Sequence, residues 1–159
     1  MAAALALAAC GREAAAPPAG ASQTMTDFTM TQTAKGARIW TLASPRARVN
    51  LDGTAALETP EIRFFRDGRH ASTARSKKGS VHGDGKDVAL VGAVVITAIS
   101  DKTTLRTERL DYSAKTERFR TEDAVTVVRP DAVLHGRGLE ADATLSNITI
   151  YHQETVLHR

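Results

Sequence analysis

The sequence predicts an all-β protein: a folded-over antiparallel sheet built from stacked hairpin repeats and open at both ends. Two observations predict this class. From residue 37 onward apolar and polar residues alternate, the periodicity of half-buried strands. Two consecutive segments also repeat with the same irregularity in their apolar pattern. The 159 residues are about one domain, and no stretch carries the apolar spacing of an amphipathic helix.

The composition excludes several classes of protein. One cysteine cannot form an internal disulfide framework or a cysteine-rich zinc site. With 21 Lys+Arg against 18 Asp+Glu, the net charge of +3 is too even for a dedicated binder of polyanions. No run approaches the roughly 18 apolar residues of a membrane-spanning helix. Aromatic residues are 4% of the chain, so we expect a core of Val, Leu, Ile and Ala.

The first ten residues are expected to be a signal segment. Residues 1–10 are an apolar run of small residues that ends in Cys10. The tetrapeptide Leu7-Ala8-Ala9-Cys10 resembles the lipobox of bacterial lipoproteins, which implies that cleavage leaves Cys10 as a lipidated N-terminus. The basic residues that usually open a signal peptide are missing here. The alternative is an alanine-rich tail with an unmodified cysteine.

Residues 11–36 are expected to be a flexible linker between the membrane and a folded domain that spans residues 37–159. The segment is rich in Ala, Pro, Ser, Thr and Gly and includes Pro17-Pro18. It shows neither helical nor strand periodicity.

The strands of the folded domain are expected in the following order. Trp40 and Leu42 share one face, and a break at Pro45 precedes Val49 and Leu51. Ile62 and Phe64 also share a face, and they precede a turn at Asp67-Gly68. Each later run of alternating residues keeps one phase: Val88, Leu90, Gly92, Val94 and Ile96; Phe119, Thr121, Asp123, Val125 and Val127; Ile148, Ile150 and Val156.

An internal repeat sets Leu105–Val127 against Leu134–Val156, at an offset of 29 residues. In both copies two leucines lie five residues apart, on opposite faces of a regular strand. A bulge or bend between them would return both to one side. The second copy has glycines that suit such a bend, Gly136 and Gly138. Each unit is therefore expected to be a bent strand, a turn and a returning strand, with leucine pairs Leu105 and Leu110, and Leu134 and Leu139.

A stack of hairpins exposes a strand edge at each end, and such edges can accept strands from neighbouring proteins. The segment Asn147–Leu157 is expected to form the last edge, and the alternative is a frayed tail. Inward residues would be Ile148, Ile150 and Val156, and outward residues Thr149, Tyr151 and Thr155. The predicted partner edge is Ile148, Thr149, Ile150 and Tyr151.

The pattern over about residues 37–159 resembles the periplasmic component C of lipopolysaccharide export, the LptC family, among the OstA-like β-jellyroll domains. "ARIWTLASPRA", "LETPEIRFFRDGR" and "VALVGAVVI" look like successive strands of that family. The strongest similarity is "TTLRTERLDYSAKTERFRTEDAVTVVRPDAVLHGRGLEAD". Many members begin with a transmembrane helix, whereas this chain offers a lipobox.

The resemblance implies a bridge rather than an enzyme. Such a component receives lipopolysaccharide from inner-membrane ABC transporter subunits and passes it to a periplasmic jellyroll bridge protein, component A. It implies a periplasmic location, anchored at the inner membrane here through lipidated Cys10, and no cofactor or nucleic acid. The opening strand Arg38–Ala43 would face the transporter.

The resemblance also implies that acyl chains travel in the apolar interior of the sheet. The alternative for the same residues is a closed core, in a scaffolding lipoprotein without lipid transfer. The lipid-binding candidates are Trp40, Leu42, Ile62, Phe64, Val94, Ile96, Leu105, Leu110, Tyr112, Phe119, Val125, Val127, Leu134, Leu139, Ile148 and Ile150.

Other charged residues suggest weaker hypotheses. A basic stretch could contact lipid phosphates, and the alternative is a solvated face; it consists of Arg63, Arg66, Arg69, Arg75, Lys77 and Lys78. A third hypothesis for the whole protein is a basic binder of anionic surfaces. Five dispersed histidines lack metal-site spacing, so no metal is expected: His70, His82, His135, His152 and His158. Gly83-Asp84-Gly85 reads as a turn, and no catalytic set is evident.

Overall fold

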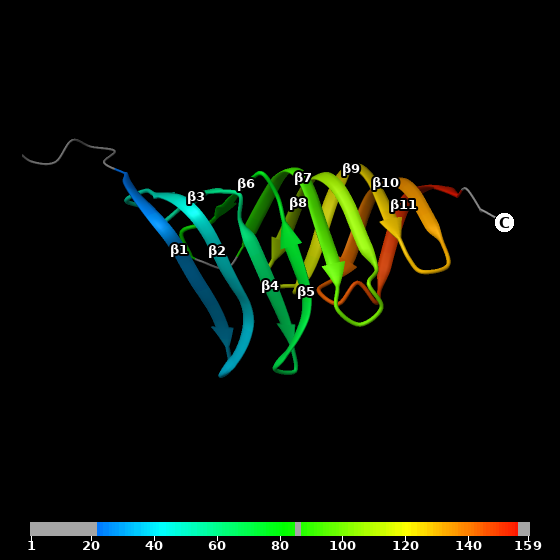
Figure 1. Cartoon of the computed structure of the whole chain (residues 1–159), viewed down its shortest axis with the longest axis horizontal. Helices are drawn as coiled ribbons and strands as arrows, with labels where there is room; N and C mark the ends of the chain where they lie inside the picture. Colours follow the sequence, from blue (N-terminus) through cyan, green and yellow to red (C-terminus); the bar gives the residue numbers. More distant parts are fainter. Residues whose placement is uncertain (1–21, 85–86, 156–159) are drawn as a thin grey trace, which may run out of the picture.

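The computed structural model describes residues 22–84 and 87–155, and these residues form a single antiparallel sheet of 11 strands without a helix (Figure 1). The predicted all-β class and antiparallel pairing are therefore confirmed. The strands are β1 (Gln23–Ala34), β2 (Ala37–Val49), β3 (Ala55–Glu58), β4 (Glu61–Arg66), β5 (Arg69–Arg75), β6 (Lys78–Val81), β7 (Val88–Ala98), β8 (Thr104–Ser113), β9 (Arg118–Val128), β10 (Val133–Asp142) and β11 (Ile148–Thr155).

Consecutive strands pair as neighbours almost throughout, so the sheet is a ladder of hairpins from β1 to β11 (Figure 1). β3 and β4 lie end to end between β2 and the next pair, which is β5 and β6. β7 pairs with β6 through its first half and with β5 through its second half. These interruptions close a ring of pairings through β2, β3, β6, β7, β5 and β4, which the sequence did not predict.

The strands bend near their middles, and the bends lie next to one another across the sheet. The register shifts between Val91 and Val94 in the β7–β8 pair, where Gly92 and Ala93 have φ values of 86° and 46°. It shifts again between Thr107 and Asp111 in the β8–β9 pair. In β10 it shifts beside Gly138, whose φ is 75°. The bends predicted between the paired leucines of the two repeats are thus confirmed.

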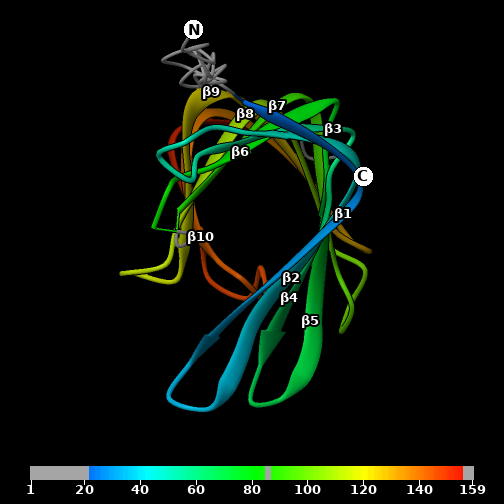
Figure 2. The same ribbon diagram turned by 90° about the vertical axis from the view of Figure 1, so that its left-hand side faces the viewer.

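The bends fold the sheet over itself (Figure 2). We call the half that contains β4 and β5 layer A, together with the strand halves paired to it, and the half that contains β3 and β6 layer B. The core lies between the layers. Phe64 of β4 in layer A packs edge-on against Phe119 of β9 in layer B, with ring centroids 4.9 Å apart. Tyr112 of β8 lies 4.8 Å from the same Phe64 ring.

The predicted linker is wrong for Gln23–Ala34, which form β1, paired along its length with β2. The strand escaped prediction because it is an edge: most of its side chains are exposed, and only Phe28 and Met30 pack against the core. A signal was present in the two-residue turn that follows, where Lys35 and Gly36 both have positive φ. Such turns join hairpin strands of matching twist.

Two further expectations in the same region need correction. Pro45 does not break the strand, because β2 runs through it from Ala37 to Val49. Leu51 does not extend the apolar phase, because it lies in the β2–β3 turn with 79% of its surface exposed. The predicted turn at Asp67-Gly68 is confirmed, with φ values of 50° and 72°.

Candidate functional site

The residues predicted to face inward do lie between the layers. The part of the set that is only half-buried comes from the last hairpin: Leu134, Ile148 and Ile150. The rest are buried: Trp40, Leu42, Ile62, Phe64, Val94, Ile96, Leu105, Leu110, Tyr112, Phe119, Val125, Val127 and Leu139. Strand alternation places them together, since every second residue faces the same side of a sheet. The interior is therefore one apolar strip that crosses the sheet from β2 to β11.

An aromatic cluster closes the middle of this strip. Phe64, Tyr112 and Phe119 contact one another, with centroid separations between 4.8 and 5.4 Å. Burial raises the pKa of Tyr112 well above its usual value, so its phenol stays neutral. The cluster joins the two layers by apolar contact alone.

The loop between β10 and β11 closes the same interior at its rim. Leu145 in this loop is 1% exposed although its φ is 56°, a value that L residues rarely adopt. Ser72 of β5 donates its hydroxyl hydrogen to the carbonyl oxygen of Ala143 at 2.5 Å. The loop of layer B thus rests on a strand of layer A. Sequence reasoning missed this contact, because the two residues are 71 positions apart.

Asp142 holds the loop in shape. Its carboxylate accepts hydrogen bonds from the Thr144 hydroxyl at 2.9 Å, the Ser146 backbone N–H at 3.0 Å and the Asn147 amide at 2.8 Å. Burial would raise the pKa of Asp142, but these hydrogen bonds outweigh it and hold the pKa below its usual value. The local sequence Asp142–Asn147 could have predicted such a loop, since Asp, Ser, Thr and Asn side chains bond nearby backbone in turns.

Buried hydroxyls inside the fold are satisfied by backbone groups at the bends. Ser44 donates to the carbonyl oxygens of Arg46 and Glu58, both at 2.7 Å. Ser76 donates to the Lys78 carbonyl at 2.8 Å, and Thr107 to the Ala124 carbonyl at 2.9 Å. The bends therefore carry their own polar partners inside an apolar strip.

The indole of Trp40 differs from these hydroxyls. Trp40 in β2 is 0% exposed, and no acceptor among the described residues accepts a hydrogen bond from its Nε1–H. Its backbone lies opposite Gln32 of β1 and Phe64 of β4. A buried donor without an acceptor is rare in folded proteins.

Each end of the described sheet presents a strand with one paired side. β11 pairs with β10 through Leu139 and Ile150, and with no other described strand. As predicted, Ile148 and Ile150 pack against the core while Thr149 and Tyr151 are exposed. At the other end the edge is β1, and this corrects the expected opening strand, because Arg38–Ala43 of β2 is covered by β1.

The basic stretch is largely a solvated face. Glu61 forms ion pairs with Arg63 at 3.2 Å and Arg75 at 2.8 Å. Burial raises the pKa of Glu61, but the hydrogen bonds and charges of these arginines outweigh it and hold the pKa below its usual value. The other residues of the stretch are exposed on β4, β5 and β6 or beside them: Arg66, Arg69, Lys77 and Lys78.

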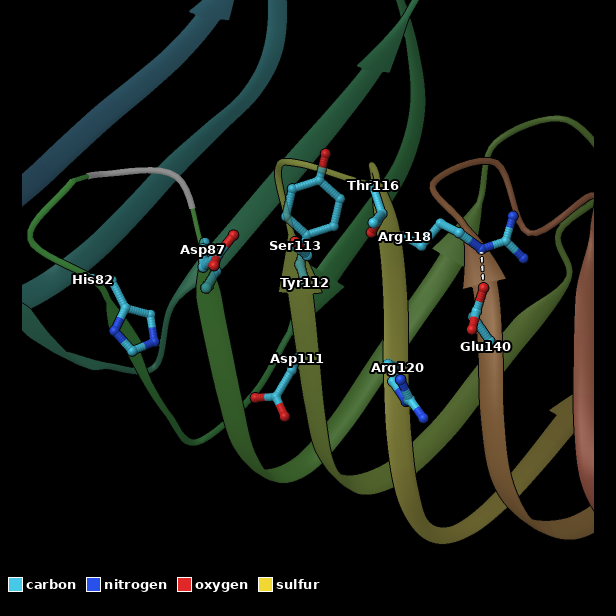
Figure 3. Close-up of a pocket in the computed structure, with 10 residues that line it drawn as sticks. His82, Asp87, Asp111, Tyr112, Ser113, Thr116, Arg118, Arg120 and Glu140 are labelled. Atoms are coloured by element: carbon cyan, nitrogen blue, oxygen red, sulfur yellow. Dashed lines mark ion pairs between the residues drawn. The ribbon is translucent and has the colours of Figure 1, made fainter.

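A hollow of about 410 Å³ beside the β8–β9 turn of layer B has lining charges of both signs (Figure 3). The Arg118 guanidinium pairs with the Glu140 carboxylate at 2.5 Å, and Asp111 lies opposite Arg120 on the neighbouring strand. Because the charges offset one another, the hollow has no strong preference for anions or cations.

No group of three His, Cys, Asp or Glu side chains is placed to hold a metal within the described ranges. His158 and Cys10, the predicted lipidation site, lie outside those ranges. No helix among the described residues is long and apolar enough to cross a membrane.

Comparison with known proteins identifies the family. The family model "LptC: Lipopolysaccharide-assembly, LptC-related" matches residues 8–158, almost the whole chain. The chain belongs to the LptC-related family. The predicted resemblance is confirmed. Among curated protein sequences none matches this LptC-related chain.

A solved structure similar to this LptC-related chain is LptH from Pseudomonas aeruginosa, the LptA-homologous periplasmic component of the lipopolysaccharide transport device. The TM-score is 0.50 at 11% sequence identity, over 83% of this chain and 82% of LptH. At this identity the similarity shows a shared fold, and that fold agrees with the folded-over antiparallel sheet expected from the repeats.

Proposed function

We propose that this LptC-related chain is a membrane-anchored periplasmic bridge. It receives lipopolysaccharide from an inner-membrane ABC transporter and passes it to the next jellyroll protein. The acyl chains are held in the interior between layers A and B. The protein provides shelter and a path, and performs no covalent chemistry.

The observation that carries this proposal is the apolar strip from β2 to β11, in a sheet whose two edge strands, β1 and β11, each have one unpaired side. Each CH₂ exposed to water costs about 0.8 kcal/mol, so a chain of about a dozen carbons costs on the order of 10 kcal/mol. Crossing an aqueous compartment therefore requires continuous apolar contact. Jellyrolls joined edge to edge would extend one strip into the next.

Binding of an acyl chain requires the layers to part, because the aromatic cluster fills the interior. The contacts that must yield are those between Phe64 and Phe119 and the hydrogen bond from Ser72 to Ala143. An acyl chain would replace the apolar contact between Phe64 and Phe119 with apolar contacts of its own. It would not replace the hydrogen bond from Ser72 to Ala143, which is the polar contact that holds the layers together.

An in-cell photocrosslink tests the proposal. A photoreactive residue is placed at Phe119, which is buried, and at its exposed neighbour Arg120 as the matched control. Lipopolysaccharide attached at position 119 alone is the expected result. Attachment at both positions would indicate association with the outer surface, and attachment at neither, with folded protein present, would contradict lipid transfer.

The anchor is tested separately. Cys10→Ser should release the mature chain from the membrane fraction, and mass spectrometry of the unaltered chain should find acyl chains on Cys10. Several acyl chains anchor a protein stably where one is marginal. Retention of the variant after washing with high salt would contradict the anchor without touching the proposal about the interior.

The second candidate is a scaffolding lipoprotein with a permanently closed β core. The complete burial of Phe64 and Phe119 favours it. It predicts no lipid adduct at position 119, and it predicts that polar substitutions in the interior that preserve folding leave lipid transport unchanged.

A further inference from the structure

We propose that the indole N–H of Trp40 is the hydrogen-bond donor for an acyl carbonyl oxygen of the lipid that enters the interior. The inference rests on the proposed function and adds a specific polar contact to it. Trp40 would then be a positioning residue, which fixes how deep the head of an acyl chain sits between the layers.

The first step concerns the surroundings of the indole N–H in this structure. Trp40 is fully buried, and its Nε1–H has no acceptor among the described residues. Buried hydroxyls nearby in the fold do not share this condition, since Ser44 and Ser72 both donate to backbone carbonyls. An unpaired donor costs folding free energy, so an interior that closes on itself is better served by phenylalanine at position 40.

The second step is the chemistry that would satisfy the donor. The side chains around it in the strip, such as Leu42 and Phe64, are apolar and offer no strong acceptor. An acyl chain attached through an ester or amide carries one carbonyl oxygen at its head and apolar carbon beyond it. That oxygen can accept the indole hydrogen while the carbons contact the rest of the strip.

The third step is the position of the donor along the path. Trp40 lies on β2, one strand from the β1 edge, and opposite Phe64 of the aromatic cluster. A carbonyl bonded to Trp40 places its chain against Phe64 and toward Phe119. The donor therefore sits at the β1 end of the apolar strip, where a chain threaded toward β11 would have its head.

The chain has one tryptophan, so the donor can be observed directly. In a ¹⁵N–¹H spectrum of the full chain, the single indole resonance belongs to Trp40. Purified lipopolysaccharide should move its proton downfield, as hydrogen bonding does, whereas n-dodecane, which lacks a carbonyl, should not. Phosphatidylethanolamine, which also carries acyl carbonyls, is tested as a second lipid. A downfield shift with either lipid supports the donor, and the lipid that produces it identifies the source.

Replacement of Trp40 by benzothienylalanine removes the donor and keeps the shape of the ring. We expect lipopolysaccharide to bind about 2- to 10-fold more weakly, the contribution of one hydrogen bond. We also expect the thermal midpoint of the lipid-free variant to rise, because an unpaired buried donor has been removed. A lower midpoint would overturn the inference, since it would mean that the N–H has a partner in the empty protein.

Two failures are distinguishable. If lipopolysaccharide crosslinks at position 119 while the indole resonance stays in place, the donor role is wrong and lipid transfer stands. If neither the crosslink nor the shift occurs, lipid transfer is wrong as well.

Discussion

The Ser72 hydroxyl donates a hydrogen bond to the carbonyl oxygen of Ala143, and this bond joins a strand of layer A to a loop of layer B. Ser72→Ala leaves the buried carbonyl without its partner, which costs about 1–3 kcal/mol. Urea unfolding should show this loss, whereas Ser100→Ala, in an exposed turn, should stay within about 0.5 kcal/mol of the unaltered protein. Equal stabilities of the two variants would mean that the loop is held by Leu145 alone.

The edge-on contact between Phe64 and Phe119 predicts a large cavity effect. Phe119→Ala should lower the free energy of unfolding by about 3–5 kcal/mol, since both the apolar surface and the packing of the cluster are lost. Phe65→Ala is the matched control, because Phe65 is half-buried on the outer face of β4. Its loss should be less than half as large. A smaller effect at position 119 would indicate that the layers are loosely packed.

Gly136 in β10 predicts a local defect. A Cβ there would clash with the Ile150 side chain and lie 2.6 Å from the carbonyl oxygen of His152. Gly136→Ala should therefore separate β11 from β10, and hydrogen exchange should accelerate only at the amides that pair these two strands. In Gly68→Ala the turn has open space and only the positive φ is penalised, by about 1–2 kcal/mol. Uniform loss of protection in the Gly136 variant would contradict the local defect.

Asp142 predicts an acid-dependent loss of stability. Its pKa in the folded protein is held below the unfolded value near 3.9. Its contribution is therefore complete above that value and is lost as the pH falls through the lower folded pKa. Asp142→Asn should be less stable at pH 7 but lose less stability than the unaltered protein between pH 5 and pH 2, by urea unfolding. Parallel pH profiles would assign the acid sensitivity to another group.

In the proposed bridge, we expect the next jellyroll to bind at the exposed residues of β11. A photocrosslinker at Thr149 or Tyr151 should capture that partner, because both residues lie on the strand with one unpaired side. Leu51 is the control position, since it is also exposed and lies in the distant β2–β3 turn. Capture from Leu51 and not from Tyr151 would place the partner elsewhere.

The sequence predicts well where a residue's surroundings repeat with the strand period. Phe119 and Val127 were assigned to the interior because their polar neighbours leave one possible face. The bend between Leu105 and Leu110 was predictable because a single slip of phase must be corrected locally. In both cases the controlling interaction lies within one hairpin.

Prediction failed where the controlling interaction is distant or the strand is nearly all exposed. β1 has few apolar side chains and depends on its backbone pairing with β2, which alternation cannot detect. The burial of Leu145 depends on layer A, brought close only by the completed fold. The Trp40 N–H is unpaired because its spatial neighbours offer no acceptor, and the sequence pattern does not show which residues those neighbours are.

The bends of neighbouring strands lie side by side, so the cross-section of the fold is set by where each strand bends and its length by how many hairpins follow. One added hairpin would lengthen the molecule by about 10 Å, two strand spacings, and leave the interior unchanged in profile. Gene duplication of a single unit could therefore adjust the distance that such a protein spans without redesigning what it carries. In this architecture the length of the molecule and the shape of its interior can therefore change independently in evolution.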